Sequence, residues 1–128
     1  MLHHIDIYVK DLEKQSNFWS WFLGELGYQE FQKWETGISW KKADFYYVLS
    51  IGDQELIQAP YQKGGIGLNH IAFGTEKRAT VDRLKEEIQA HGGKVLYVED
   101  YPYAGGPDHN ALYFNDQEGM KRELVATE

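Results

Sequence analysis

The chain opens with a clear alternation of polar and apolar residues. In residues 4–9, HIDIYV, every second side chain is apolar, which is typical of a strand with one covered face. Asp11 follows as a candidate N-cap, and residues 12–26 place apolar side chains at helical spacing up to Gly27, a residue suited to the position after a helix. Residues 28–60 then alternate aromatic and β-branched runs with turn signals, which predicts three strands. The first half is therefore predicted to be β-α-β-β-β.

The same pattern returns after a Pro/Gly-rich break at about residues 60–67. The segment LNHIAFGT resembles LHHIDIYV in residue types and in alternation. One offset of 66 positions relates the strand start, the helix face and the helix end of the two halves: His4 and His70, Ile5 and Ile71, Phe22 and Ile88, Gly27 and Gly93. This periodicity indicates an internal duplication.

The second half supplies the same elements in the same order. A helix is expected within residues 78–93, and strands are expected within 94–103, 110–116 and 120–127. The predicted fold is α+β, a single domain of residues 1–128 made of two βαβββ modules, about 1–62 and 68–128. We expect the modules to form a curved mixed sheet around a central cavity, with the helices outside.

Composition narrows the possible functions. The chain has 128 residues, a net charge of −7 and scattered Lys and Arg, which disfavours a nucleic-acid partner. It has no cysteine, which excludes disulfides and thiolate sites. No apolar run is long enough for a membrane span, and the start lacks the layout of a signal peptide. A soluble cytoplasmic protein without a membrane partner is therefore expected.

Two adjacent histidines near the start raise the question of which one has a chemical role. Neighbouring side chains on a strand point to opposite faces, so we expect His3 and His4 to face apart. The offset of 66 pairs His4 with His70, whereas His3 is paired with Asn69. A matched pair of imidazoles on the face away from the helices predicts a metal site, although a single strand histidine is more often structural.

A carboxylate is expected to complete such a site. Glu123 lies in the final strand between Arg122 and an apolar run, and an exposed edge-strand charge is the alternative explanation. The first-half segment GDQELIQA resembles GMKRELVA with a shift of two, which makes Glu55 the candidate fourth ligand. Gln54 and Gln58 are competing oxygen donors.

Three segments in order resemble the vicinal oxygen chelate superfamily, also called the glyoxalase/bleomycin resistance protein/dioxygenase family. They are HIDIYVKDLEKQSNFW, GLNHIAF and LYFNDQEGMKREL, and together they span nearly the whole chain. The resemblance implies metal ligands at His4, His70 and Glu123, with a fourth near Glu55. It also implies a divalent ion (Ni, Co, Mn, Fe or Zn) that holds two neighbouring oxygens of a small-molecule substrate, and a homodimer.

The predicted reaction is that of a lyase, an isomerase or epimerase, or a dioxygenase. Glu123 or Glu55 is the expected catalytic base, because a carboxylate at the metal is placed to move a proton. A second class also fits the chain: a metal-free protein of the bleomycin-resistance type that binds a drug, suggested by the many aromatic residues and the acidic charge.

The segment DYPYAGGPDHNALYF also holds candidate chemistry. His109 precedes a predicted strand, and the glycines at 105 and 106 suggest a movable loop. A lid with His109 as a proton shuttle and a plain glycine-rich surface loop are both consistent with this segment.

Overall fold

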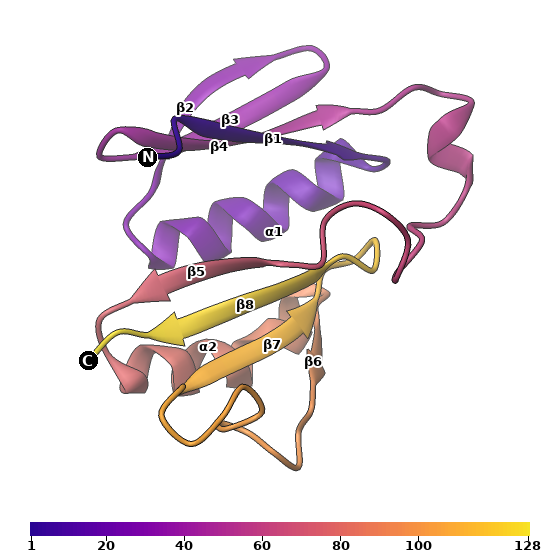
Figure 1. Cartoon of the computed structure of the whole chain (residues 1–128). Coiled ribbons are helices and arrows are strands. Elements are labelled where there is room, and N and C mark those ends of the chain that lie inside the picture. Colours follow the sequence, from indigo (N-terminus) through magenta and orange to yellow (C-terminus); the bar gives the residue numbers. More distant parts are fainter. The chain divides into compact units, whose positions relative to one another are not determined.

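The computed structural model describes all 128 residues, and they form two compact units, Met1–Pro60 and Tyr61–Glu128. Figure 1 shows a helix and a small sheet in each unit. None of the helices has the length and apolar character needed to cross a bilayer.

The first unit has a four-stranded sheet and one main helix. Its strands lie in the order β1-β4-β3-β2, with β1 parallel to β4 and the other neighbours antiparallel. A short 3₁₀ helix follows β4. The element bounds are β1 His4–Val9, α1 Leu12–Glu25, β2 Gln29–Trp34, β3 Gly37–Lys42, β4 Phe45–Ile51 and η1 Leu56–Gln58.

The predicted ends of the first helix are confirmed. The Asp11 side chain accepts a hydrogen bond from the backbone N–H of Lys14, which satisfies one of the free donors of the first turn. At the other end Gly27 adopts φ +90°, a left-handed conformation that a side chain would strain.

The second unit repeats this topology. Its strand order is β5-β8-β7-β6, again with one parallel pair, β5 with β8. The element bounds are β5 Ile71–Thr75, α2 Arg78–Ile88, η2 Gln89–His91, β6 Lys94–Leu96, β7 Ala111–Asn115 and β8 Lys121–Ala126. The α+β class with two βαβββ modules is thus confirmed.

Two local predictions for the second unit were wrong. The strand expected through residues 94–103 ends at Leu96, because Tyr97 has φ +53° and starts a series of turns. The left-handed glycine after the helix is Gly92, with φ +94°, and not Gly93. η2 occupies the positions equivalent to the last three residues of α1, and this tighter 3₁₀ turn places the left-handed glycine one residue before the equivalent of Gly27.

Each sheet has one face covered by its own helix. In the first unit the ring of Trp19 on α1 lies 5.2 Å from that of Tyr47 on β4, and both side chains are fully buried. In the second unit Val81 and Leu84 of α2 are fully buried, as is Leu124 of β8. Side chains alternate along a strand. Val48, next to Tyr47, and Glu123, next to Leu124, therefore lie on the face of each sheet that points away from its helix.

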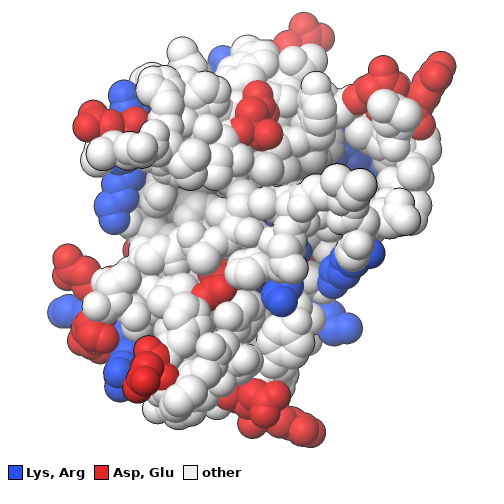
Figure 2. Space-filling model, viewed as in Figure 1, with Lys and Arg blue, Asp and Glu red and all other residues white.

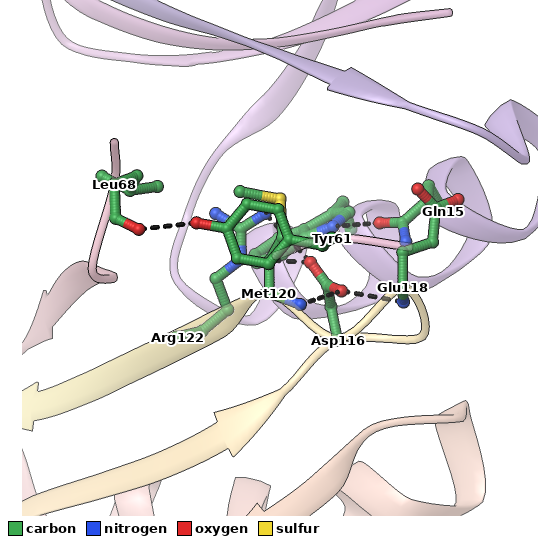
Figure 3. Close-up of polar contacts among 8 residues, drawn as sticks. Gln15, Tyr61, Leu68, Asp116, Glu118, Met120 and Arg122 are labelled. Carbon is green, nitrogen blue, oxygen red and sulfur yellow. Dashed lines mark hydrogen bonds and ion pairs between the residues drawn. The ribbon is translucent and has the colours of Figure 1, made fainter. Parts of the chain in front are cut away.

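A buried ion pair organises the turn between β7 and β8. The Nε atom and one Nη atom of Arg122 donate to Asp116 Oδ2, at 3.2 and 3.0 Å respectively (Figure 3). The other oxygen of Asp116 accepts from the backbone N–H groups of Glu118 and Met120. Asp116 therefore closes the turn at 116–119 while it neutralises a guanidinium that has no solvent exposure.

Candidate functional site

Glu123 lies at the centre of a polar cluster in the second unit. It sits on β8, on the face away from α2, and is only 3% exposed. Its Oε1 atom is 2.9 Å from His70 Nε2, and its Oε2 atom is hydrogen-bonded to His109 Nε2. The two imidazoles retain 30% and 40% of their side-chain exposure. A buried carboxylate is thus held between two half-exposed histidines.

Local structure sets the positions of both histidines. His70 immediately precedes β5, which pairs in parallel with β8 and places Ala72 opposite Glu123. His109 comes from the loop before β7. A Cβ atom at Gly105 would lie 2.6 Å from the ring of His109 and 2.6 Å from Tyr113 Oη, so only glycine lets this loop lie so close.

The second nitrogen of His70 has its own partner. Asn69 Oδ1 lies 2.6 Å from His70 Nδ1. With the Asn69 amide oriented in this way, Nδ1 carries the proton, and a neutral ring then presents the lone pair of Nε2 to Glu123. At a separation of 2.9 Å, His70 Nε2 and Glu123 Oε1 therefore share either a proton or a cation.

Tyr113 is the cross-strand neighbour of Glu123 on the same face of the sheet. Its ring lies 5.9 Å from that of His70. Desolvation, followed by the negative charge of Glu123, raises the pKa of the Tyr113 phenol above its usual value. The phenol therefore keeps its proton at neutral pH, and it shares a hydrogen bond with the carboxylate of Glu123.

The histidine pair in the first unit differs from the expected arrangement. His4 is exposed and stacks on Tyr46 with 4.7 Å between the ring centroids and 5° between the planes. The Nδ1 atoms of His3 and His4 are only 2.9 Å apart, so the expectation that these side chains face apart was wrong. The reason is that β1 begins at His4, and His3 is not bound by strand geometry.

Glu55 lies outside the sheet of the first unit. It occupies the residue before η1, is exposed, and its backbone N–H donates to Asp53 Oδ1. Strand register pairs Ala72 with Glu123 and the equivalent Asp6 with Val48, so Val48 occupies the place of Glu123. The sequence match of Glu55 with Glu123 does not follow the sheet register, and the role of Glu55 as a ligand stays a prediction.

The donor atoms around Glu123 suit a divalent ion in part. Nitrogen and oxygen ligands about 2.1 Å from an octahedral ion lie about 3 Å apart when they are neighbours, which matches His70 Nε2 and Glu123 Oε1. No group of three or more His, Asp or Glu side chains is arranged to hold an ion. This pair therefore has the spacing of two neighbouring ligands.

The sequence pattern of the Glyoxalase/Bleomycin resistance protein/Dioxygenase superfamily matches residues 3–113. The chain belongs to this family. The uncharacterized protein YqjT of Bacillus subtilis (strain 168) is 46% identical over 125 residues, which are 98% of each protein. The resemblance noted in the sequence is thus confirmed.

Solved structures show the same vicinal oxygen chelate fold. A crystal structure from Bacillus halodurans has 39% identity and a TM-score of 0.93 and covers 98% of this chain and 95% of its own. The fosfomycin resistance protein FosX of Listeria monocytogenes has 25% identity and a TM-score of 0.69, with 100% and 91% coverage. A point mutant of FosX was solved with Mn(II) and 1S,2S-dihydroxypropylphosphonic acid, at 24% identity and a TM-score of 0.67, with 100% and 90% coverage.

His109 is the site residue that sequence reasoning left undecided. Its place just before a strand was noted, but nothing in the 66-residue offset pointed to it, because the matching position in the first half is Ala43. Only the folded loop shows that it reaches the carboxylate of Glu123.

Proposed function

We propose that this family member is a divalent-metal-dependent enzyme acting on a small substrate with neighbouring oxygens, as a lyase, an isomerase or epimerase, or a dioxygenase. The observation that carries the proposal is the row Asn69, His70, Glu123, in which two lone pairs face each other at the separation of neighbouring metal ligands. Asn69 has the position of an outer residue that fixes the tautomer of a metal-binding histidine.

A bound divalent ion would act as a Lewis acid toward oxygens of the substrate. The residues of the chain supply the remaining chemistry. Glu123 is proposed to accept a proton from the substrate, and His109, bonded to the second oxygen of that carboxylate, to pass it to solvent. Tyr113, the cross-strand neighbour of Glu123, is proposed to donate to a substrate oxygen in place of the carboxylate of Glu123.

The proposed ligand set also includes His4 and Glu55 of the first unit. The family resemblance supports both, and the exposed His4 ring has its Nε2 edge without a hydrogen-bond partner. The Mn(II) complex of a FosX mutant supports divalent-ion binding in a related fold. We further propose a small-molecule substrate and a homodimer, as the resemblance implies.

Metal titration of the untagged full chain tests this proposal. We expect one ion per chain for at least one of Ni, Co, Mn, Fe and Zn. His70→Ala should weaken binding by about 100-fold or more, and Asn69→Ala by about tenfold through loss of ring orientation. His91→Ala, at an exposed position beyond α2, is the matched control and should bind as the wild type does.

Absence of stoichiometric metal in the wild-type chain would overturn the proposal. So would His70→Ala binding metal as tightly as the His91→Ala control. Parallel titrations of His4→Ala and Glu55→Gln decide separately whether these two residues belong to the ligand set.

A second function is favoured by one observation. Both oxygens of Glu123 already have histidine partners, and no group of three or more His, Asp or Glu side chains is arranged to hold an ion. Metal-free binding of a small molecule, as proposed for the bleomycin-resistance type, is compatible with this closed cluster. Ligand binding that survives in a His4→Ala/His70→Ala variant would support that function over the metal enzyme.

A further inference from the structure

A pocket of about 360 Å³ lies within the second unit, apart from the atoms of the Glu123 cluster. Its walls are the loop at 61–69, Leu96 and Tyr97 at the end of β6, and Lys121 at the start of β8. Tyr61 anchors the loop, since its hydroxyl donates to the backbone oxygen of Leu68 at 2.5 Å (Figure 3). We call this space the loop pocket.

The charge of the loop pocket is opposite to that of the chain. Its lining contains Lys63 and Lys121 and no acidic residue, in a protein of net charge −7. Figure 2 shows Lys and Arg in small separate groups on the viewed face, without one large basic area. Two lysines around one pocket are therefore a local feature that the overall composition does not explain.

Neither lysine forms an ion pair. Lys63 Nζ donates to the amide oxygen of Asn115 at 3.1 Å. Lys121 Nζ lies 5.0 Å and 5.1 Å from the ring centroids of Tyr97 and Tyr113. These contacts orient both ammonium groups and leave their charges uncompensated.

The loop adds neutral donors to these charges. The backbone N–H groups of Gly64 and Gly67 make no hydrogen bond within the chain, whereas that of Gly65 closes the turn at 63–64. Gly64 and Gly67 have positive φ, and a Cβ at either would meet nothing within 4 Å, so the space beside them is open. Free N–H groups on an open glycine-rich loop are suited to binding an anion.

The loop pocket shares residues with the proposed reaction site. Asn69 lines the pocket and contacts His70 Nδ1. Lys121 is two residues before Glu123 on the same face of β8, a separation of about 7 Å along a strand. The ring of Tyr97 lies 5.5 Å from that of Tyr113. A ligand only a few atoms long would therefore reach from the loop pocket to Glu123.

We infer that the loop pocket binds the anionic group of the substrate, a carboxylate, phosphate or phosphonate, between Lys63 and Lys121. The inference rests on the proposed function, because it assigns that reaction to a small anion with neighbouring oxygens. Lys63 and Lys121 are positioning residues: they hold one end of the substrate while its oxygens face His70 and Glu123.

Anion binding to the metal-free full chain tests the inference without using activity. Inorganic phosphate and lactate are titrated into the EDTA-treated protein, and backbone amide NMR signals are followed, with uncharged lactamide as the matched probe. We expect shifts concentrated at Gly64, Gly65 and Gly67. Lys63→Gln and Lys121→Gln should each weaken binding by about tenfold, the loss expected for one charge-assisted contact.

Lys77→Gln at the start of α2 is the control, because it makes the same charge change outside the pocket. Equal binding of lactamide and lactate would overturn the inference, as would an equal loss in Lys77→Gln or shifts away from the loop. Anion binding in a chain that takes up no metal would leave the pocket standing and the proposed function refuted. Metal uptake without anion binding would refute the loop pocket as an anion site and leave the proposed function standing.

Discussion

The two units share one topology and differ in what they place at equivalent positions. Both sheets pair their first strand in parallel with their last and continue antiparallel to an edge. At one register position the first unit has Val48 and the second unit has Glu123. At the neighbouring position the first unit has Tyr47 and the second unit has Arg122. Because all four side chains are nearly or fully buried, the same backbone supports an apolar or a charged layer.

The difference shows how a duplicated fold divides stability and chemistry. The first unit fills its helix-facing layer with Trp19 and Tyr47, which need no charge partner. The second unit buries Arg122 with Asp116 on that face and Glu123 with two histidines on the other. Replacing a buried ion pair by apolar residues is often neutral or stabilising, so stability alone does not account for the charged layers of the second unit.

Breaking the buried pair should have the largest effect. Asp116→Ala leaves Arg122 charged and buried without its carboxylate and removes two acceptors from the turn, so we expect the free energy of unfolding to fall by about 3–5 kcal/mol. Urea denaturation measures this loss.

Two variants sharpen this test. Glu86→Ala, on the exposed face of α2, should change stability by less than about 0.5 kcal/mol. The double variant Asp116→Ala/Arg122→Met should be more stable than Asp116→Ala alone, because the unpaired charge is gone. A double variant that is no more stable would show that the turn, and not the charge, carries the cost.

Substitutions that make Val48 acidic and Glu123 apolar are expected to have the next largest effect on stability. Val48→Glu places a carboxylate at a position that is only 5% exposed and should destabilise the chain by about 2–3 kcal/mol at pH 7. Glu123→Leu removes a buried charge whose partners remain half-exposed and should raise stability by about 1 kcal/mol.

Both variants of this exchange are measured in EDTA by urea denaturation, so that metal binding does not contribute. The destabilisation by Val48→Glu should shrink toward pH 4, where the carboxyl is protonated. A loss of stability in Glu123→Leu would mean that the hydrogen bonds of Glu123 support the fold beyond their role in the site.

Substitutions at the first residues of the two helices should change stability by a smaller amount. Asp11 caps α1 through its side chain, whereas Lys77 at the start of α2 makes no side-chain cap. Asp11→Ala should cost about 1 kcal/mol, and Lys77→Asp should add about 0.5–1 kcal/mol by supplying an acceptor and a favourable charge. Thermal unfolding measures both, and Asp11→Asn, which keeps the acceptor, should stay close to the wild type.

The smallest expected effect concerns alkaline pH. Burial, followed by the hydrogen bond and charge of Asp82, raises the pKa of Tyr101 above its usual value near 10. The unfolded chain therefore loses this proton first, so stability is unaffected below about pH 10 and falls as the pH rises above it. Tyr101→Phe should reduce that fall.

One proton changes stability by at most about 1.4 kcal/mol per pH unit, and the half-buried ring should give less. Tyr103→Phe, at an exposed position, is the control and should keep the wild-type slope. Equal slopes in both variants between about pH 10 and 11.5 would exclude Tyr101 as a source. The fall that remains in Tyr101→Phe is expected from Tyr28 and Tyr113, whose pKa values are also raised.

The sequence by itself determined the duplicated architecture and half of the candidate site. Alternation, helical spacing and the 66-residue offset are local properties, and they predicted both modules, the cap at Asp11 and the glycine at 27. They also selected His70 and Glu123, because a repeated histidine and an acid in an apolar strand are visible without a structure.

Only the tertiary structure decided which atoms meet. Strand register showed that Val48, and not Glu55, is the equivalent of Glu123. Loop closure at Gly105 brought His109 to the carboxylate, and the end of β6 at Leu96 opened the pocket with its two lysines. Register and loop paths depend on contacts between residues far apart in the chain, which periodicity does not encode.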